Sequence, residues 1–136
     1  MIYTAQSLCI GWGDAEINTD VEWAHAVAPG ANINLVVPPS AAFQDVNQAE
    51  FDVMNEGLGT VLSGSYGSSE TSTSTAEMET ESLISEMGAA VGISTNFATG
   101  DYGDYSALGS VATVSAPADS PWAYSRWGGK SGAERG

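Results

Sequence analysis

The sequence predicts an α/β fold in which a mainly parallel sheet is flanked by helices on its faces. Up to Gly100, helical and strand patterns alternate along the chain, and the connections between them are short. Such alternation implies right-handed crossovers that bring the strands into one sheet. The 136 residues are 43% hydrophobic, and no linker or internal repeat divides them. We therefore expect residues 1–136 to form a single domain, or part of one, with one modest core.

The first expected helix runs from about residue 15 to residue 28. Its apolar residues recur at three- and four-residue spacing, Asp14 precedes it as a candidate N-cap, and Pro29-Gly30 ends it. The next apolar run, residues 33–37, is closed by two prolines. It predicts a short buried strand.

Two more helix–strand units follow. A second helix leads into a strand over residues 60–65, and after a Ser/Thr/Gly-rich loop at 67–75 a third helix ends at Gly92 and leads into a strand over residues 93–98. The apolar residues that predict these helices are Phe43, Val46, Val53 and Met54 in the second, and Met78, Leu83, Met87, Ala90 and Val91 in the third. Beyond Gly100 we expect only loops and short strands.

The chain is strongly acidic. Acidic side chains outnumber basic ones 17 to 3, which gives a formal net charge of −14. Such a surface repels phosphate backbones and anionic lipids, so neither nucleic acid nor a membrane is an expected partner. It sheds most of its charge as carboxylates protonate near pH ~4, which fits a secreted, acid-tolerant protein.

Other sequence features limit the compartment only weakly. Cys9 is the only cysteine, so we expect a free thiol and no internal disulfide. No apolar run approaches the roughly 20 residues of a membrane helix. The first residues lack the layout of a signal peptide, so a targeting segment is expected upstream of Met1.

Three carboxylates are candidates for catalysis. Glu16 and Asp20 lie four residues apart on the first expected helix, so their side chains project from one face, and a buried pair there would share a proton and suit acid/base chemistry. Asp101 lies in a glycine-flanked loop directly after an expected strand, where ligands gather in parallel sheets. The alternatives are a solvated acidic helix face for the pair and a plain turn residue for Asp101.

Other constellations are weaker. His25 is the sole histidine and falls off the Glu16/Asp20 face, so we interpret it as structural rather than as part of a Ser-His-Asp triad. The acidic residues Glu77, Glu79, Glu81 and Glu86 lie on an expected helix and lack the alternating ligands of a calcium loop, so a solvated face is expected there. No phosphate-binding glycine loop opens any expected helix, which argues against a nucleotide-binding domain.

Taken together, several segments resemble the sedolisins, subtilisin-like serine-carboxyl peptidases that cleave proteins in acid. Residues 16–30 resemble the family's Glu-x-x-x-Asp helix followed by Ala-Pro-Gly, residues 63–70 its Ser-x-Ser-Trp/Tyr-Gly-x-x-Glu segment, and residues 98–103 its Ala-x-Gly-Asp-x-Gly turn. Residues 114–121, leading to Gly128-Gly129, are similar to its Phe-Pro-Ala-x-Ser-Pro and Gly-Gly-Thr stretches. The resemblance covers about residues 16–129 and leaves 130–136 as an unmatched tail.

The resemblance implies a subtilisin-like three-layer fold, incomplete here, and a role for each candidate. Glu16 would be the general base, Asp20 would hold and polarise it, and Asp101 would stabilise the oxyanion. Ser65, Tyr66, Gly67 and Gly100 would line the groove that binds a polypeptide substrate. The family also implies a pro-segment in the parent protein and a calcium site in the full-length domain.

The chain departs from the family at its catalytic serine. No Gly-Thr-Ser occurs in the sequence, and Lys130 follows Gly128-Gly129 where the family has Thr. Ser131-Gly132 lies too close to this turn to be the nucleophile motif. We therefore expect no cofactor or metal ligand in this chain, and a fragment of an acid-acting serine-type endopeptidase that is inactive alone. The alternative is a non-catalytic peptide-binding or interaction module derived from the same fold.

Overall fold

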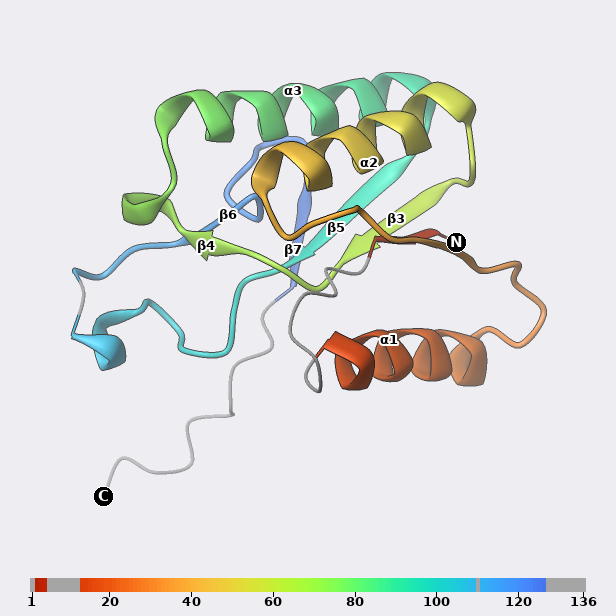
Figure 1. The fold of residues 1–136 in the computed structure, drawn as a ribbon, viewed down its shortest axis with the longest axis horizontal. Coiled ribbons are helices and arrows are strands. Elements are labelled where there is room, and N and C mark those ends of the chain that lie inside the picture. The colour runs from red at the N-terminus through yellow and green to blue at the C-terminus, as the bar shows by residue number, and fades with distance from the viewer. Residues whose placement is uncertain (1, 5–12, 110, 127–136) are drawn as a thin grey trace.

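A five-stranded parallel sheet organises the part of the chain that the computed structural model describes, residues 2–4, 13–109 and 111–126. The strand order is β2-β1-β3-β5-β7, and every pairing within it is parallel. Helix α1 lies on one face of this sheet, and α2 and α3 lie side by side on the other (Figure 1). The strands of the sheet are β1 (Ile2–Thr4), β2 (Asn34–Val36), β3 (Val61–Gly64), β5 (Ser94–Ala98) and β7 (Tyr124–Arg126).

The helices confirm the predicted order of elements and most of their ends. They are α1 (Gly13–Val27), α2 (Phe43–Glu56) and α3 (Thr75–Val91). Helix α1 begins at Gly13, so Asp14 lies inside its first turn rather than at the N-cap. Gly92 adopts the left-handed conformation, with φ at 81°, and ends α3 as predicted. The described chain contains no helix long and apolar enough to cross a membrane.

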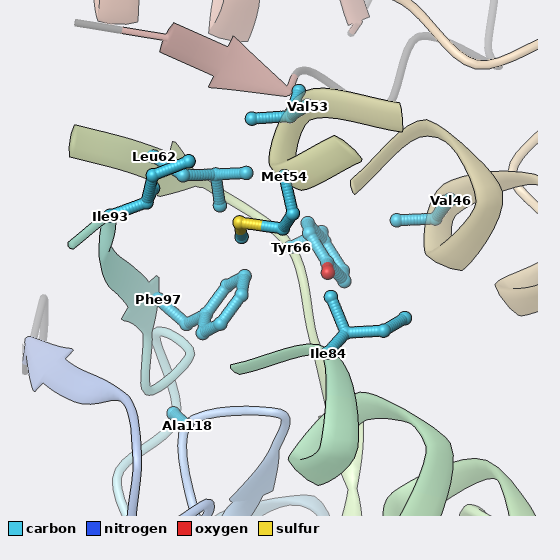
Figure 2. Packing of buried hydrophobic residues seen from close by; sticks show 9 residues of the cluster. All are labelled: Val46, Val53, Met54, Leu62, Tyr66, Ile84, Ile93, Phe97 and Ala118. Carbon is cyan, nitrogen blue, oxygen red and sulfur yellow. The ribbon is translucent and has the colours of Figure 1, made fainter. Parts of the chain in front are cut away.

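The core lies between the sheet and the α2/α3 layer. Phe97 and Leu62 from the sheet, with Val46, Val53 and Met54 from α2, form its centre (Figure 2). The Tyr66 and Phe97 rings pack edge to face, with centroids 5.6 Å apart. Of the four apolar positions that predicted the second helix, Val46, Val53 and Met54 face the core, whereas Phe43 is half-buried and lies outside this cluster.

One strand prediction needs correction, and one strand pairing was not indicated by the sequence. Residues 33–37 were expected to form a buried strand, but β2 is an edge strand, and Asn34 and Leu35 are exposed. An edge strand has a neighbour on one side only, so its apolar run does not require burial. No local pattern indicated that Tyr124–Arg126 would return to pair with β5 as β7. The tail 130–136, Gly128-Gly129, Ser131-Gly132 and Cys9 lie outside the described residues.

The buried face of α3 also differs from the prediction. Leu83 and Val91, two of the apolar residues whose spacing predicted this helix, are 64% and 57% exposed. The buried residues of α3 are Glu81, Ile84, Ser85 and Gly88. Glu81 is therefore not part of a solvated acidic face. Gly88 allows this, because a Cβ at that position would lie 3.1 Å from the Met54 side chain of α2.

A capping box begins α3 and gives a testable contribution to stability. The Ser74 hydroxyl accepts a hydrogen bond from the Glu77 backbone N–H at 3.2 Å, and the Glu77 carboxylate accepts one from the Ser74 N–H at 3.0 Å. We expect Ser74→Ala to lower the free energy of unfolding by about 1 kcal/mol in urea titrations. Thr75→Ala, an exposed change beside the intact cap, is the control. An equal loss in both variants would contradict the capping role.

Candidate active site

The first two candidate carboxylates lie one turn apart on α1. Glu16 is exposed and Asp20 is half-buried, on the helix that covers the face of the sheet opposite α2 and α3 (Figure 1). Both residues lie within α1, so the four-residue spacing places them on the same side of the helix, as predicted. Ala24, a further turn along, is buried, so this stripe of α1 is turned towards the body of the domain.

The other candidates follow neighbouring strands of the sheet. Ser65 comes directly after β3, and Asp101 comes three residues after the end of β5. These two strands pair in parallel, with Gly64 opposite Phe97, so their carboxyl ends share one edge of the sheet. Ligand sites in parallel sheets form at this edge.

The electrostatics of Glu16 link these residues. Its pKa is raised first by partial burial, then by the negative charge of Asp20 and that of Asp101, while a hydrogen bond with the Ser65 side chain acts in the opposite direction. Residues from α1, the end of β3 and the loop after β5 therefore all act on the Glu16 carboxyl group. The sequence placed these residues on separate elements, and the fold brings them together.

Asp20 completes this group. Burial raises its pKa, and a hydrogen bond with the Ser65 side chain lowers it. One carboxylate oxygen, Oδ2, is buried and has no hydrogen-bond partner among the described residues. Ser65 thus interacts with both Glu16 and Asp20. Two carboxyl groups with raised pKa values, those of Glu16 and Asp20, beside a hydroxyl are suited to moving a proton in acid.

The turn that carries Asp101 requires glycines on both sides and packs against Tyr105. Gly100 and Gly103 have positive φ angles of 80° and 65°, and Asp101 is exposed between them. A Cβ at Gly100 would lie 3.0 Å from the Tyr105 hydroxyl, so only glycine fits there without displacing that ring. The Tyr105 hydroxyl in turn donates to Ser115 Oγ at 3.2 Å.

The predicted substrate segment divides between core and surface. Ser65 is half-buried and Gly67 is exposed, but the Tyr66 side chain lies in the core, where its hydroxyl donates a hydrogen bond to Glu50. Of Tyr66, only the main chain is therefore available to line the substrate groove that the resemblance implies. Strand β4 (Ser68–Ser69) then pairs with β6 (Ser115–Ala116) in antiparallel fashion. A Cβ at Gly67 would lie 2.9 Å from the Ala116 carbonyl oxygen, so glycine permits this close approach.

Other predicted features stay apart from this cluster. His25 lies exposed in the last turn of α1. Among the described residues, no group of three or more His, Cys, Asp or Glu side chains could hold a metal ion. Sequence reasoning missed Glu50, which lies in no motif, and assigned no role to Ser115, although it lies in the matched stretch 114–121.

Comparisons with known proteins identify the fold. No protein-family model matches the sequence, and no curated protein matches it. A solved structure of Pseudomonas sedolisin, a serine-carboxyl proteinase complexed with two molecules of pseudo-iodotyrostatin, superposes over 91% of this chain with a TM-score of 0.75 and 21% identity. A lanthipeptide protease superposes over 74% with a TM-score of 0.60 and 17% identity. The chain spans 39% and 32% of those two proteins. It therefore has a subtilisin-like protease fold and corresponds to part of such a domain.

Proposed function

We propose that this chain is part of an acid-acting serine-type endopeptidase of the sedolisin kind. The observation that carries the proposal is that Ser65 hydrogen-bonds both Glu16 and Asp20, while the charge of Asp101 acts on Glu16. The likeness of the fold to two proteases supports it. The serine nucleophile is proposed to come from a segment that is not part of these 136 residues.

Each carboxyl group has a distinct proposed task in peptide-bond hydrolysis. Glu16, as the carboxylate, takes the proton of the serine hydroxyl, and Asp20 beside it holds and polarises Glu16. Asp101, as the protonated acid, donates a hydrogen bond to the oxyanion of the tetrahedral intermediate. One carboxyl group must be ionised while another is protonated, and both conditions hold together only in acid.

The proposed substrate is an extended polypeptide. The main chain of residues 65–67 and Gly100 lie at the ends of β3 and β5, beside the carboxyl cluster. A peptide that adds as a strand to such a segment is recognised by its main chain first, with side chains selecting among substrates. We propose that the complete peptidase is secreted and carries a pro-segment and a calcium site elsewhere.

A second candidate function is a peptide-binding module without catalysis. This candidate applies if the natural protein ends at Gly136, because no Gly-Thr-Ser occurs in these 136 residues. Such a module would keep the segment 65–67 and the carboxyl cluster but would release its peptide unchanged. Binding without turnover distinguishes it from a peptidase.

The nucleotide sequence through and beyond codon 136 tests the two candidates. We expect another reading frame beyond this codon to encode Ser-Gly-Thr-Ser. A protein that contains residues 1–136 followed by the product of that frame should cleave an unfolded protein at about pH 4 but not at about pH 7. A genuine stop, together with peptide binding and no cleavage by the 136-residue chain, would favour the module. Neither cleavage nor peptide binding would remove both candidates.

A further inference from the structure

Two glutamates are buried in the α2/α3 layer, on the opposite side of the sheet from the carboxyl cluster of α1. Glu50 of α2 and Glu81 of α3 are each 1% exposed. Carboxyl groups are almost never fully buried unless a cation or a set of hydrogen bonds compensates for the lost water. No basic group of the described chain acts on either one.

The groups that face these glutamates are acidic or neutral. Tyr66, which follows β3, donates its hydroxyl hydrogen bond to Glu50 Oε1, and Glu81 adds negative charge from α3. Glu81 is faced by Asp119, from the loop after β6, and by Glu77 of its own helix. Both carboxyl oxygens of Glu81 are buried without a hydrogen-bond partner among the described residues. Two ionised carboxylates in this setting would repel each other in a site that water does not reach.

Protonation removes this conflict. Burial raises the pKa of Glu50 to about 8, with the Tyr66 hydrogen bond lowering it and Glu81 raising it. Burial also raises the pKa of Glu81 to about 7, with further contributions from Asp119 and Glu77. The pKa of the Tyr66 hydroxyl is raised by burial and by Glu50, so it stays a neutral donor. As neutral acids, both side chains no longer carry the cost of burying a charge.

We propose that Glu50, Glu81 and Tyr66 form a proton-dependent latch that holds α2, α3 and the segment after β3 together in acid and releases them as the pH rises. The latch lies outside the carboxyl cluster at Glu16, and it acts on folding rather than on chemistry. It goes beyond the proposed function and would operate in a peptidase or in a peptide-binding module.

The sign of the effect follows from proton linkage. In the unfolded chain both glutamates titrate near the ordinary value of 4.5, whereas the folded chain holds their protons up to about pH 7 and pH 8. Stability is therefore full below about pH 4.5 and falls as the pH rises through the folded pKa values. Near pH 6 each glutamate raises the unfolding equilibrium constant about tenfold per pH unit, and the two together about a hundredfold.

Tyr66 joins the latch to the candidate active site. Its ring packs against Phe97 in the core, and its main chain lies between Ser65 and Gly67. If Glu50 ionises and the packing of α2 and α3 around it loosens, the position of Tyr66 changes. Ser65, the preceding residue, is then displaced from Glu16 and Asp20. Loss of the buried protons would thus disorganise the segment at which a peptide is proposed to bind.

The test is the pH dependence of unfolding in the 136-residue chain. Urea titrations between about pH 5 and about pH 7.5 give the unfolding constant for the wild type, Glu50→Gln, Glu81→Gln and the double variant. We expect each single variant to remove about one tenfold step per pH unit from the wild-type slope near pH 6. The double variant should keep only the slope that Glu16, Asp20 and Asp119 contribute in every variant, since their pKa values are also raised. Gln at position 50 can still accept the Tyr66 hydrogen bond, which keeps that contact intact.

Matched controls and a second measurement separate the effect of the buried glutamates from a general effect of removing a carboxyl group. Glu56→Gln on α2 and Glu79→Gln on α3 make the same change at exposed positions and should leave the slope unchanged. If a variant does not fold, carboxyl carbon NMR of the wild type should show two glutamates still protonated at about pH 6. A wild type whose stability is flat or rises between about pH 5 and about pH 7 would overturn the latch. So would a double variant with the wild-type slope, or ionised signals for all glutamates at about pH 6.

Discussion

Glu16→Gln is expected to lower kcat/KM for peptide-bond hydrolysis by about 10²- to 10⁴-fold at acidic pH, in the peptidase that joins residues 1–136 to the serine segment. The amide keeps the size and hydrogen-bonding shape of the side chain but cannot take a proton. Because the base acts only in the transition state, kcat should fall while KM changes little. Initial rates on an extended peptide at about pH 4 measure the effect.

A second glutamate of the same helix, Glu22, provides the control. Glu22→Gln makes the same chemical change at an exposed position of α1 and should leave the rate within about twofold of the wild type. A Glu16→Gln enzyme with the wild-type rate would show that another group takes the proton. Equal losses in both variants would point to damage to α1 rather than to the loss of a base.

Phe97→Ala should produce the largest loss of stability expected from a single core substitution. Phe97 is 1% exposed, packs edge to face against Tyr66, and lies in the centre of the core (Figure 2). A Cβ at Gly64 would lie 2.9 Å from the Phe97 ring, so the backbone of β3 already closes tightly on it. Truncation leaves a cavity that this rigid wall cannot fill, and we expect the free energy of unfolding to fall by about 3–5 kcal/mol.

Urea unfolding at a fixed acidic pH measures this loss without interference from the buried glutamates. Leu83→Ala is the matched control, because that leucine is 64% exposed on α3 and its truncation should change the stability by less than about 0.5 kcal/mol. A loss below about 1 kcal/mol for Phe97→Ala would contradict the assignment of this ring to the centre of the core. A comparable loss for Leu83→Ala would mean that its face of α3 is also covered.

Local patterns in the sequence determined most of the order of elements. Pro29-Gly30 and Gly92 mark the ends of α1 and α3, where the backbone can no longer continue as a helix. The four-residue spacing placed Glu16 and Asp20 on one side of α1, and the glycines around Asp101 predicted its turn. These features depend on neighbours within a few residues, so the sequence alone could indicate them.

Contacts between distant segments decided the rest. Whether Glu81 or Leu83 faces the core depends on how α3 lies against α2, and the close approach at Gly88 turns the glutamate inward. The hydrogen bonds of Ser65 with Glu16 and Asp20 depend on the end of β3 lying close to α1. The buried hydroxyl of Tyr66 depends on a hydrogen-bond acceptor, Glu50, that is sixteen residues away in the sequence. The sequence itself thus determined the helices, the turns and the candidate carboxylates. Only the tertiary structure selected which acids meet and which are buried, because burial and charge proximity arise from packing between elements rather than from spacing within one.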